Sequence, residues 1–350
     1  MRRTLNVSFF LPLFSLIAAA QEPLDFKAPG LQSLQWEGQV RLRGEWRRPS
    51  SYAAPSDAAW GDVFQRTRLG LKIRVSDRLG GQVEFQDSRL WGEDSSLTAD
   101  NPGFLLRQGN ITLDGLCGGK VSVKAGRMAV PALGDQRLLS PLDWSNTGRA
   151  WEAVHVSAKS DSWGAEVFSA DTRNSLRKSA GGRDVLLVSG LQVRRDFSGK
   201  GAAELLLLGR TLHEAGLDGT GSLRAEARRG KIKISGEGVL QATDGMKRKA
   251  EAWACALRAE AEVSDRLTIS AEHSAASGDP DPSDGLRRTF DPVLPFAHAY
   301  LGHSDLVGWK NIRSVMAGLS LKLREGLFAH ADGHSFRLMD VRDAWYSAAG

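Results

Sequence analysis

Gln35-Trp-Glu-Gly-Gln-Val-Arg-Leu-Arg-Gly-Glu-Trp46 is the most regular stretch of the chain. Its even-numbered residues are apolar or glycine, and its odd-numbered residues are polar or charged. A period of two residues is typical of a β-strand whose two faces meet different environments, and a soluble sandwich strand has the same period. Tryptophan at both ends of the apolar face favours a membrane strand, because aromatic residues gather at the membrane interfaces.

The same alternation continues along the chain. Between Val63 and Val75 one face is largely apolar, whereas the other carries Arg66, Arg68 and Arg74. Residues 249–263 are rich in helix formers, but they keep the period of two and are interpreted as a strand. Further strands are expected at residues 82–86, 104–113, 120–127, 150–159, 163–170, 185–194, 202–213, 221–228, 231–241, 267–275, 312–323 and 327–336.

Short and long connections alternate between these strands. Outer-membrane barrels have this layout, with short turns on the periplasmic side and long loops outside. A soluble barrel of this size would need an apolar interior, which the inward Arg, Lys, Glu and Gln residues do not supply. The pattern therefore predicts an all-β fold, a transmembrane antiparallel up-and-down β-barrel with about 15 visible strands and about 16–18 in the complete form. The long loops are expected at residues 47–62, 93–103, 128–149, 171–184 and 276–311.

The strand count carries an expectation about the chain's end. Bacterial single-chain barrels have an even number of strands, and Ser347–Gly350 ends this chain without an amphipathic strand. An open sheet edge in lipid would leave backbone groups without hydrogen bonds. We therefore expect that the last strands of the barrel are missing from this sequence.

The amino terminus has the layout of a secretory signal peptide in residues 1–20. Arg2 and Arg3 precede an apolar core, and three alanines end it before Gln21. Residues 21–34 are then a short periplasmic segment, and residues 35–350 form the outer-membrane barrel domain. The protein is therefore expected in the bacterial outer membrane, in contact with its lipid.

The composition excludes several classes of protein. After the signal peptide, no apolar run has the roughly 18 residues of a membrane helix, and mean hydropathy is −0.28. The charge balance is mildly basic, with 46 Lys and Arg against 41 Asp and Glu. The arginines are interleaved with apolar residues of the lipid face, which argues against nucleic-acid binding. No motif indicates a metal, a cofactor or a catalytic nucleophile, so the protein is not expected to be an enzyme.

Arginines dominate the polar faces of the first two barrel strands. Arg41 and Arg43 lie on one strand, and Arg66, Arg68 and Arg74 lie on the next. Neighbouring strands bring these charges within the Debye length of about 8 Å, so they repel unless acids or an anion neutralise them. They are interpreted either as a structural Arg/Glu network or as a positive field for anions, and the two roles are compatible.

The stretch from Gly126 to Trp151 is the second concentration of arginine. It contains Arg127, Arg137 and Arg149, and it is expected to fold into the lumen as a constriction close to the wall arginines. Asp135 is expected to orient an arginine, and Asp143 is interpreted as a turn cap. The predicted anion-binding residues are Arg43, Arg66, Arg68, Arg74, Arg89, Arg127, Arg137 and Arg149, with Asp135 as the supporting acid.

Several stretches resemble the alginate export family of outer-membrane porins. They are Arg66-Thr-Arg-Leu-Gly70, Glu84-Phe-Gln-Asp-Ser-Arg89, Gly126-Arg127, Gly134-Asp-Gln-Arg-Leu138, Asp143-Trp144, Asn146, Gly148-Arg149, Asp305, Gly308, Asn311-Ile312, His334-Ser-Phe336, Asp343-Ala344 and Trp345-Tyr346. The resemblance implies a wide barrel with an arginine-lined constriction that passes a polyuronate. Members often continue with a few more strands after the last of these motifs.

The predicted function is passive passage of anionic solutes through an outer-membrane porin. The expected partner is an acidic polysaccharide such as alginate or its oligomers, because arginine binds carboxylates through two parallel hydrogen bonds. A general anion-preferring porin for small anions is the alternative. A hydrolase embedded in an outer-membrane barrel is a remote second alternative. The sequence leaves the direction of transport, gating and oligomeric state open.

Overall fold

The computed structural model describes residues 14–24, 30–47, 60–92, 104–172, 185–212, 216–244, 249–303 and 305–348. It divides into two compact units. The first contains residues 1–113, 127–129 and 143–150, and the second contains residues 114–126, 130–142 and 151–350. Most of the expected loops at residues 47–62, 93–103 and 171–184 lie outside the described residues, as do residues 1–13 of the expected signal peptide.

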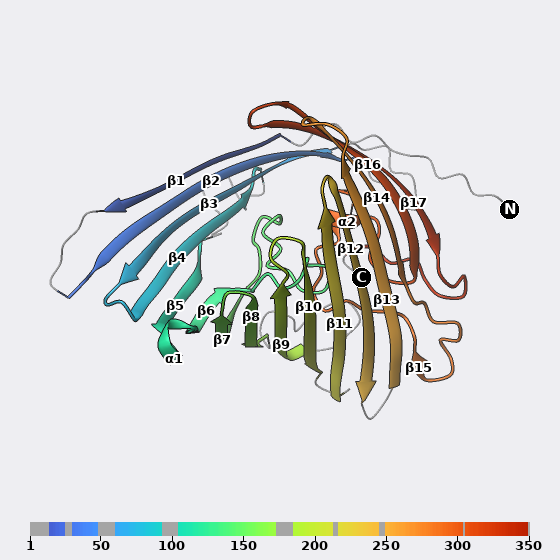
Figure 1. Ribbon diagram of the computed structural model, residues 1–350, viewed down its shortest axis with the longest axis horizontal. Helices are drawn as coiled ribbons and strands as arrows, with labels where there is room; N and C mark the ends of the chain where they lie inside the picture. The colour runs from blue at the N-terminus through green and yellow to red at the C-terminus, as the bar shows by residue number, and fades with distance from the viewer. Residues whose placement is uncertain are drawn as a thin grey trace. The chain divides into compact units, whose positions relative to one another are not determined.

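The first unit is an antiparallel sheet of consecutive strands (Figure 1). Each strand pairs with the next one along the chain, and the connection between β3 and β4 is a turn of four residues, 75–78. The strands are β1 (Phe14–Leu24), β2 (Ser33–Arg47), β3 (Trp60–Arg74), β4 (Leu79–Leu90) and β5 (Leu105–Gly115).

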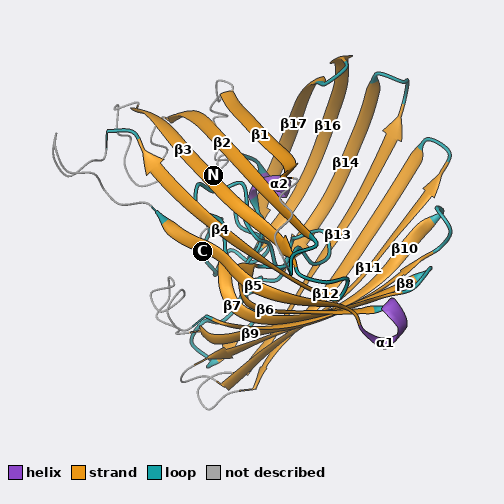
Figure 2. Cartoon of the chain, turned by 90° about the vertical axis from the view of Figure 1, so that its left-hand side faces the viewer, coloured by secondary structure: helices purple, strands orange, loops and turns teal. Residues whose placement is uncertain are grey.

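The second unit repeats this up-and-down order (Figure 2). From β7 to β14 each strand pairs with the next, β14 pairs with β16, and β16 pairs with β17. The elements that lie wholly or mostly in this unit are α1 (Leu116–Gly119), β6 (Val121–Ala129), β7 (Ala150–Lys159), β8 (Trp163–Asp171), β9 (Val185–Asp196), β10 (Gly201–Leu212), β11 (Gly216–Arg229), β12 (Ile232–Asp244), β13 (Lys249–Glu262), β14 (Leu267–Ala276), β15 (Leu286–Arg287), α2 (His298–Leu301), β16 (Ile312–Arg324) and β17 (Leu327–Leu338).

The pattern of burial is the reverse of that in a soluble protein, because charged side chains are buried and leucine side chains are exposed. On β3, Arg66 is 1% exposed, whereas Leu69 on the opposite face is 57% exposed. On β10, Glu204 is buried, whereas Leu205 and Leu207 are exposed. Leucines exposed on one face of a strand, with charged residues buried on its other face, are typical of strands whose apolar face contacts lipid. The alternation seen in the sequence therefore separates an outward apolar face from an inward polar face.

The predicted strands are confirmed. All fifteen correspond to described strands, and residues 249–263 form β13 despite their helix propensity. Pairing with β12 and β14 on both sides explains this outcome, because tertiary context overrides a weak local preference. In the described parts of the chain, no helix has the length and hydropathy needed to cross a bilayer.

Strand β1 spans the expected end of the signal peptide. Its residues pair with β2 from Phe14 opposite Gly44 to Leu24 opposite Leu34. Residues 14–20 of the expected signal peptide and residues 21–24 of the expected periplasmic segment therefore lie in one strand. Cleavage after Ala20 stays a prediction.

Two long connections of the second unit build an apolar core against the inward face of its strands. Residues 136–140 run beside residues 294–296, where Ser140 N donates to Leu294 O at 3.0 Å and Leu294 N donates to Leu138 O at 2.8 Å. Leu139 and Phe290 are fully buried in this core. We expected a polar inward face, and this region of it is apolar instead, because loop side chains cover apolar strand residues there.

The C-terminal segment after β17 is tied to the connection before β16 through Asn311. The Asn311 amide donates to Asp340 O and Ala344 O, both at 3.0 Å, and its oxygen accepts from Asp340 N at 2.8 Å. Asn311 has a positive φ of 46°, a conformation that asparagine tolerates better than most residues. A Cβ at Gly278 would lie 1.9 Å from the Asn311 oxygen, so this contact also requires glycine.

Replacing Asn311 with alanine is expected to lower the free energy of unfolding by about 3 kcal/mol, because three backbone groups lose their partners. Denaturant unfolding in detergent, followed by tryptophan fluorescence, measures the change. Lys322→Ala, which removes an ion pair with the highly exposed Glu325, is the control and should change stability by less than about 0.5 kcal/mol. Equal effects of the two substitutions would contradict this role of Asn311.

Candidate functional site

Five buried arginines converge on the inward face of the first unit. We call Arg41, Arg43, Arg66, Arg68 and Arg107 the arginine cluster. They come from three strands, β2, β3 and β5, and each residue is at most 9% exposed. Alternation places the four on β2 and β3 inward, since the apolar residues between them point outward. The guanidinium groups meet residues 143–147, which we call the docked segment.

Strand register places two of these charges directly opposite each other. Arg41 on β2 is the cross-strand partner of Arg66 on β3, and like charges in this position repel. Both side chains donate to the same acceptor, the carbonyl oxygen of Asp143, at 2.9 and 2.8 Å. Arg41 and Arg66 also donate to Ser145 O, at 2.7 and 3.2 Å. The docked segment therefore supplies the negative ends of backbone dipoles that offset the repulsion.

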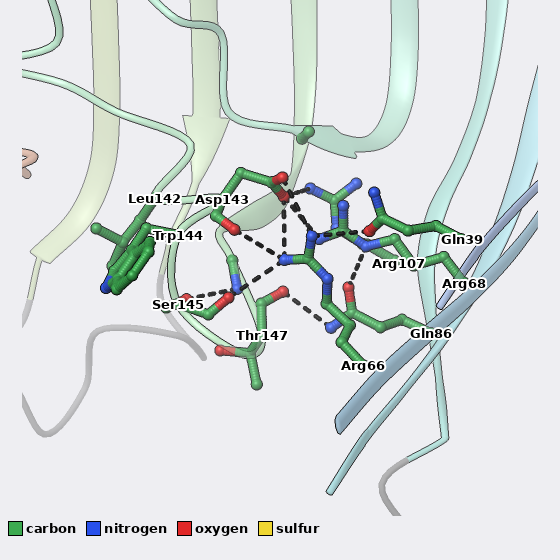
Figure 3. A network of polar contacts seen from close by, with 12 residues as sticks. Gln39, Arg66, Arg68, Gln86, Arg107, Leu142, Asp143, Trp144, Ser145 and Thr147 are labelled. Atoms are coloured by element: carbon green, nitrogen blue, oxygen red, sulfur yellow. Dashed lines mark hydrogen bonds and ion pairs between the residues drawn. The ribbon is translucent and has the colours of Figure 1, made fainter. Parts of the chain in front are cut away.

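The carboxylate of Asp143 lies among three guanidinium groups (Figure 3). Its oxygen atoms lie 2.7 Å from Arg68 Nη2, 3.2 Å from Arg66 Nη2 and 3.5 Å from Arg107 Nη2. The Asp143 side chain is 51% exposed, whereas its three partners are buried. This part of the arginine cluster is thus a carboxylate-binding site that solvent reaches and that the chain's own carboxylate fills.

The charge of Asp143 is stabilised by this arrangement. Burial alone would raise its pKa, but the hydrogen bond from Arg68 and the charges of Arg68, Arg66 and Arg107 outweigh burial, so the pKa of Asp143 lies below its ordinary value. The carboxylate therefore stays ionised through the neutral and mildly acidic range. The contact persists until the pH falls below the normal range of a carboxyl group.

Further polar contacts fix the rest of the docked segment. Arg43 donates to Trp144 O at 2.5 Å, and its guanidinium lies 4.6 Å from the Trp144 ring centroid. On β4, Gln86 donates to Thr147 O at 2.9 Å (Figure 3). Ser88, two residues further along the same strand, donates to Asn146 O at 3.0 Å. Each strand from β2 to β4 therefore contributes at least one inward side chain that holds this segment.

Arg107 is the member of the cluster that the period of two did not predict. A strict alternation would turn it outward, because Gln108 and Asn110 point inward. The register between β4 and β5 shifts at Glu84 and Phe85, so Arg107 and Gln108 both face inward and both donate to Glu84, at 2.7 and 3.3 Å. A β-bulge re-aims a side chain in this way, and the sequence carried no signal of it.

Among the described residues, the arginine cluster carries more positive charge than the negative charge of the three acids with which it forms ion pairs of 2.8 Å or less. The cluster has five guanidinium groups, and Glu45, Glu84 and Asp143 accept ion pairs from it at 2.8, 2.7 and 2.7 Å. Five positive charges thus stand against the three negative charges of these acids. We call this difference the positive surplus, and a field of this sign on an inward face attracts anions.

Arg137 lies in the second unit and has a different environment. Its side chain is 5% exposed and donates to Glu272 at 2.7 Å and to Asp135 at 3.0 Å, and it stacks 3.6 Å from the Tyr300 ring centroid. Burial lowers the pKa of Arg137, but the charges of Glu272 and Asp135 raise it by more. The predicted pairing of Asp135 with Arg137 is present, and Asp135 also caps the turn by accepting from Arg137 N at 3.1 Å.

Two predicted site residues of the first strands lie apart from the arginine cluster. Arg74 shares the inward face of β3 but lies six residues beyond Arg68. Arg89 lies three residues from the inward Gln86 on β4, so strand alternation places it on the opposite face, and it pairs with Asp87 at 2.8 Å. Neither arginine therefore contributes to the carboxylate-binding site around Asp143.

The remaining two predicted site residues flank the long connection between β6 and β7. Arg127 lies in β6 and donates to Leu106 O at 2.8 Å. Arg149 directly precedes β7, and burial lowers its pKa to about 10. Their role in anion binding stays a prediction.

Two expectations about the stretch from Gly126 to Trp151 need correction. The expected loop at residues 128–149 begins two residues later, because β6 continues to Ala129, whereas β7 begins at Ala150 as predicted. The contacts that reach Arg66 and Arg68 come from Asp143 and backbone carbonyl groups rather than from further arginines. Asp143 is therefore an ion-pair partner and not only a turn cap.

Comparisons with known proteins agree with this architecture. A family model described as alginate export matches residues 32–172 and 213–350. No match was found among curated proteins. Among solved structures, Acinetobacter baumannii OccAB4 aligns with a TM-score of 0.57 at 13% identity, over 87% of this chain and 83% of that chain.

Two further solved structures align comparably. Salmonella typhi OmpF, in complex with daunomycin, gives a TM-score of 0.53 at 11% identity, over 89% of this chain and 92% of that chain. Vibrio cholerae OmpT gives a TM-score of 0.52 at 11% identity, over 89% of this chain and 88% of that chain. Likeness at such low identity shows the fold alone, which is that of outer-membrane porin barrels. The predicted fold class is confirmed.

Proposed function

The chain belongs to the alginate export family, and we propose that it passes an acidic polysaccharide, such as alginate or its oligomers, along the arginine cluster. Family and fold together place the protein in the bacterial outer membrane as a channel. We propose two further points, that the solute is anionic and that the arginines bind it.

The observation that carries this proposal is the binding of Asp143. A half-exposed carboxylate is held by Arg66, Arg68 and Arg107, whose side chains are buried and preoriented. A uronate carboxylate has the same charge and the same two acceptor oxygens. Since the intramolecular partner is reachable from solvent, a solute carboxylate can exchange with it without unfolding the strands.

Passage also requires that binding be weak. Guanidinium groups bind carboxylates with directional, charge-assisted hydrogen bonds, and several such sites in sequence let an ion leave one site as it enters the next. Competition from Asp143 lowers the net affinity of the cluster for a solute. This competition supports transfer of a polyanion rather than its retention.

A general anion-preferring porin is the second candidate, because the positive surplus would attract any small anion. The two candidates differ in the response to polymer. A polyuronate path is blocked transiently by uronate oligomers, whereas a pore that serves only small anions is not. The absence of enzymatic activity stays a prediction.

Replacing Arg41 and Arg68 together with glutamine is expected to lower the chloride-to-potassium permeability ratio roughly twofold or more, because it removes the positive surplus of the cluster. Glutamine keeps a hydrogen-bond donor for the docked segment. Reversal potentials in a KCl gradient across a planar bilayer measure the ratio. Arg228→Gln, which removes an exposed ion pair with Glu262 on the second unit, is the control. Unchanged reversal potentials in the double variant would show that these arginines are structural.

A further inference from the structure

A groove of about 680 Å³ lies on the outward face of strands β10 to β13. Cross-strand register arranges its lining in three successive rows. Leu207, Gly221, Leu240 and Trp253 form one outward row, and Gly219, Ala242 and Glu251 form the next outward row. The residues between these rows are Leu208, Thr220, Gln241 and Ala252, which point inward, so only their backbone reaches the floor.

Two glycines of β11 create the depth of this groove. A Cβ at Gly219 would lie 3.8 Å from its nearest neighbour, Ala242 O, and one at Gly221 would lie 3.5 Å from a methyl group of Leu207. These distances are ordinary van der Waals contacts, so close packing does not require glycine at either position. The side chains that flank the floor stand clear of the surface, and Leu240 is 73% exposed.

The chemistry of the groove selects an apolar occupant. Ladder hydrogen bonds to β10 and β12 use the backbone polar groups of β11, so the floor offers water few partners. The walls are aliphatic apart from the indole ring of Trp253, and Glu251 marks one end. Because this face of an outer-membrane channel contacts the bilayer, the material that reaches the groove is lipid hydrocarbon.

We propose that this groove binds one acyl chain of a membrane lipid. A lipid gains no hydrophobic free energy by leaving its neighbours for a protein surface, so its retention depends on van der Waals contact. An acyl chain that lies over Gly219 and Gly221, between Leu207 and Leu240, contacts the protein below it and on both sides. A second copy of the protein would not reach this floor with a flat sheet, because the exposed Leu240 side chain stands in the way. The site depends on the outer-membrane location and not on the solute that passes.

Filling the groove tests the proposal. Gly219→Leu and Gly221→Leu place a side chain in the space without a backbone clash. Gly238→Leu is the matched control, since Gly238 lies on the outward face of β12 and does not line the groove. A Cβ at Gly238 would meet no atom within 4 Å, so this substitution is also free of clashes. Planar-bilayer conductance checks that each variant is folded.

The readout is native mass spectrometry after incubation with dipalmitoyl phosphatidylethanolamine in detergent micelles. The wild type and Gly238→Leu are expected to retain one lipid per chain, and the two groove variants are expected to lose this lipid by at least about tenfold. Equal retention in all four proteins would overturn the proposal. A dimer mass in the wild type that Gly219→Leu converts to a monomer would also overturn it, because a second copy would then be the occupant.

Discussion

Replacing Asp143 with asparagine is expected to tighten block by uronate oligomers about two- to fivefold, because it removes the carboxylate that competes for Arg66, Arg68 and Arg107. Because the Asp143 side chain is half exposed, the gain in oligomer affinity corresponds to the weaker range of ion-pair energies. Asparagine keeps the size of the side chain, and the backbone carbonyl of residue 143 still accepts from Arg41 and Arg66. Anion selectivity should rise in parallel.

Single-channel block and reversal potentials measure both effects of this substitution. Asp161→Asn is the control, because Asp161 is an exposed residue in the turn between β7 and β8. It should leave block and selectivity unchanged. If Asp143→Asn behaves like this control, the contact between Asp143 and the arginine cluster has no part in anion passage.

Replacing Arg137 with methionine is expected to lower the free energy of unfolding by about 3–5 kcal/mol. Methionine retains much of the side-chain volume but removes the ion pairs of Arg137 with Asp135, Glu237 and Glu272. Asp135 then keeps the longer contact with Arg224 at 3.8 Å, and Glu272 keeps Arg258 at 3.4 Å. Glu237 and Glu272 are buried, so solvent cannot replace Arg137. The stacking of its guanidinium on Tyr300 is also lost.

Denaturant unfolding in detergent measures this loss. Arg228→Met removes an arginine that pairs with Glu262 at 3.1 Å, but both side chains are about half exposed. This control should change the free energy of unfolding by less than about 0.5 kcal/mol. A similar small change for Arg137→Met would contradict the interpretation of Arg137 as the cation that neutralises a buried acidic group.

The strands were predictable from sequence because each has two chemically different faces. Gln35 to Trp46 shows this most clearly, and the same rule outweighed helix propensity in β13. Period two also assigned Arg43, Arg66 and Arg68 to one inward face, where the structure brings them together. A period depends on local pleating alone, so it needs no knowledge of distant contacts.

The contacts of the docked segment were not predictable in the same way. Arg107 joins the cluster through a register shift, and a bulge leaves no mark on the alternation of β5 as a whole. Asp143 resembles many turn-capping residues in sequence, and its role depends on side chains 75 and 77 positions away. The apolar core around Leu139 and Phe290 likewise forms between two loops that are distant in sequence.

Block of single channels by uronate oligomers tests the central claim most directly. Wild-type protein in a planar bilayer is expected to show transient, concentration-dependent block by oligomannuronate, and no block by a neutral oligosaccharide of the same length. The block should weaken as salt rises, because screening reduces contacts between exposed charges. Equal behaviour of the acidic and neutral oligomers would contradict the proposal that the arginine cluster passes an acidic polysaccharide.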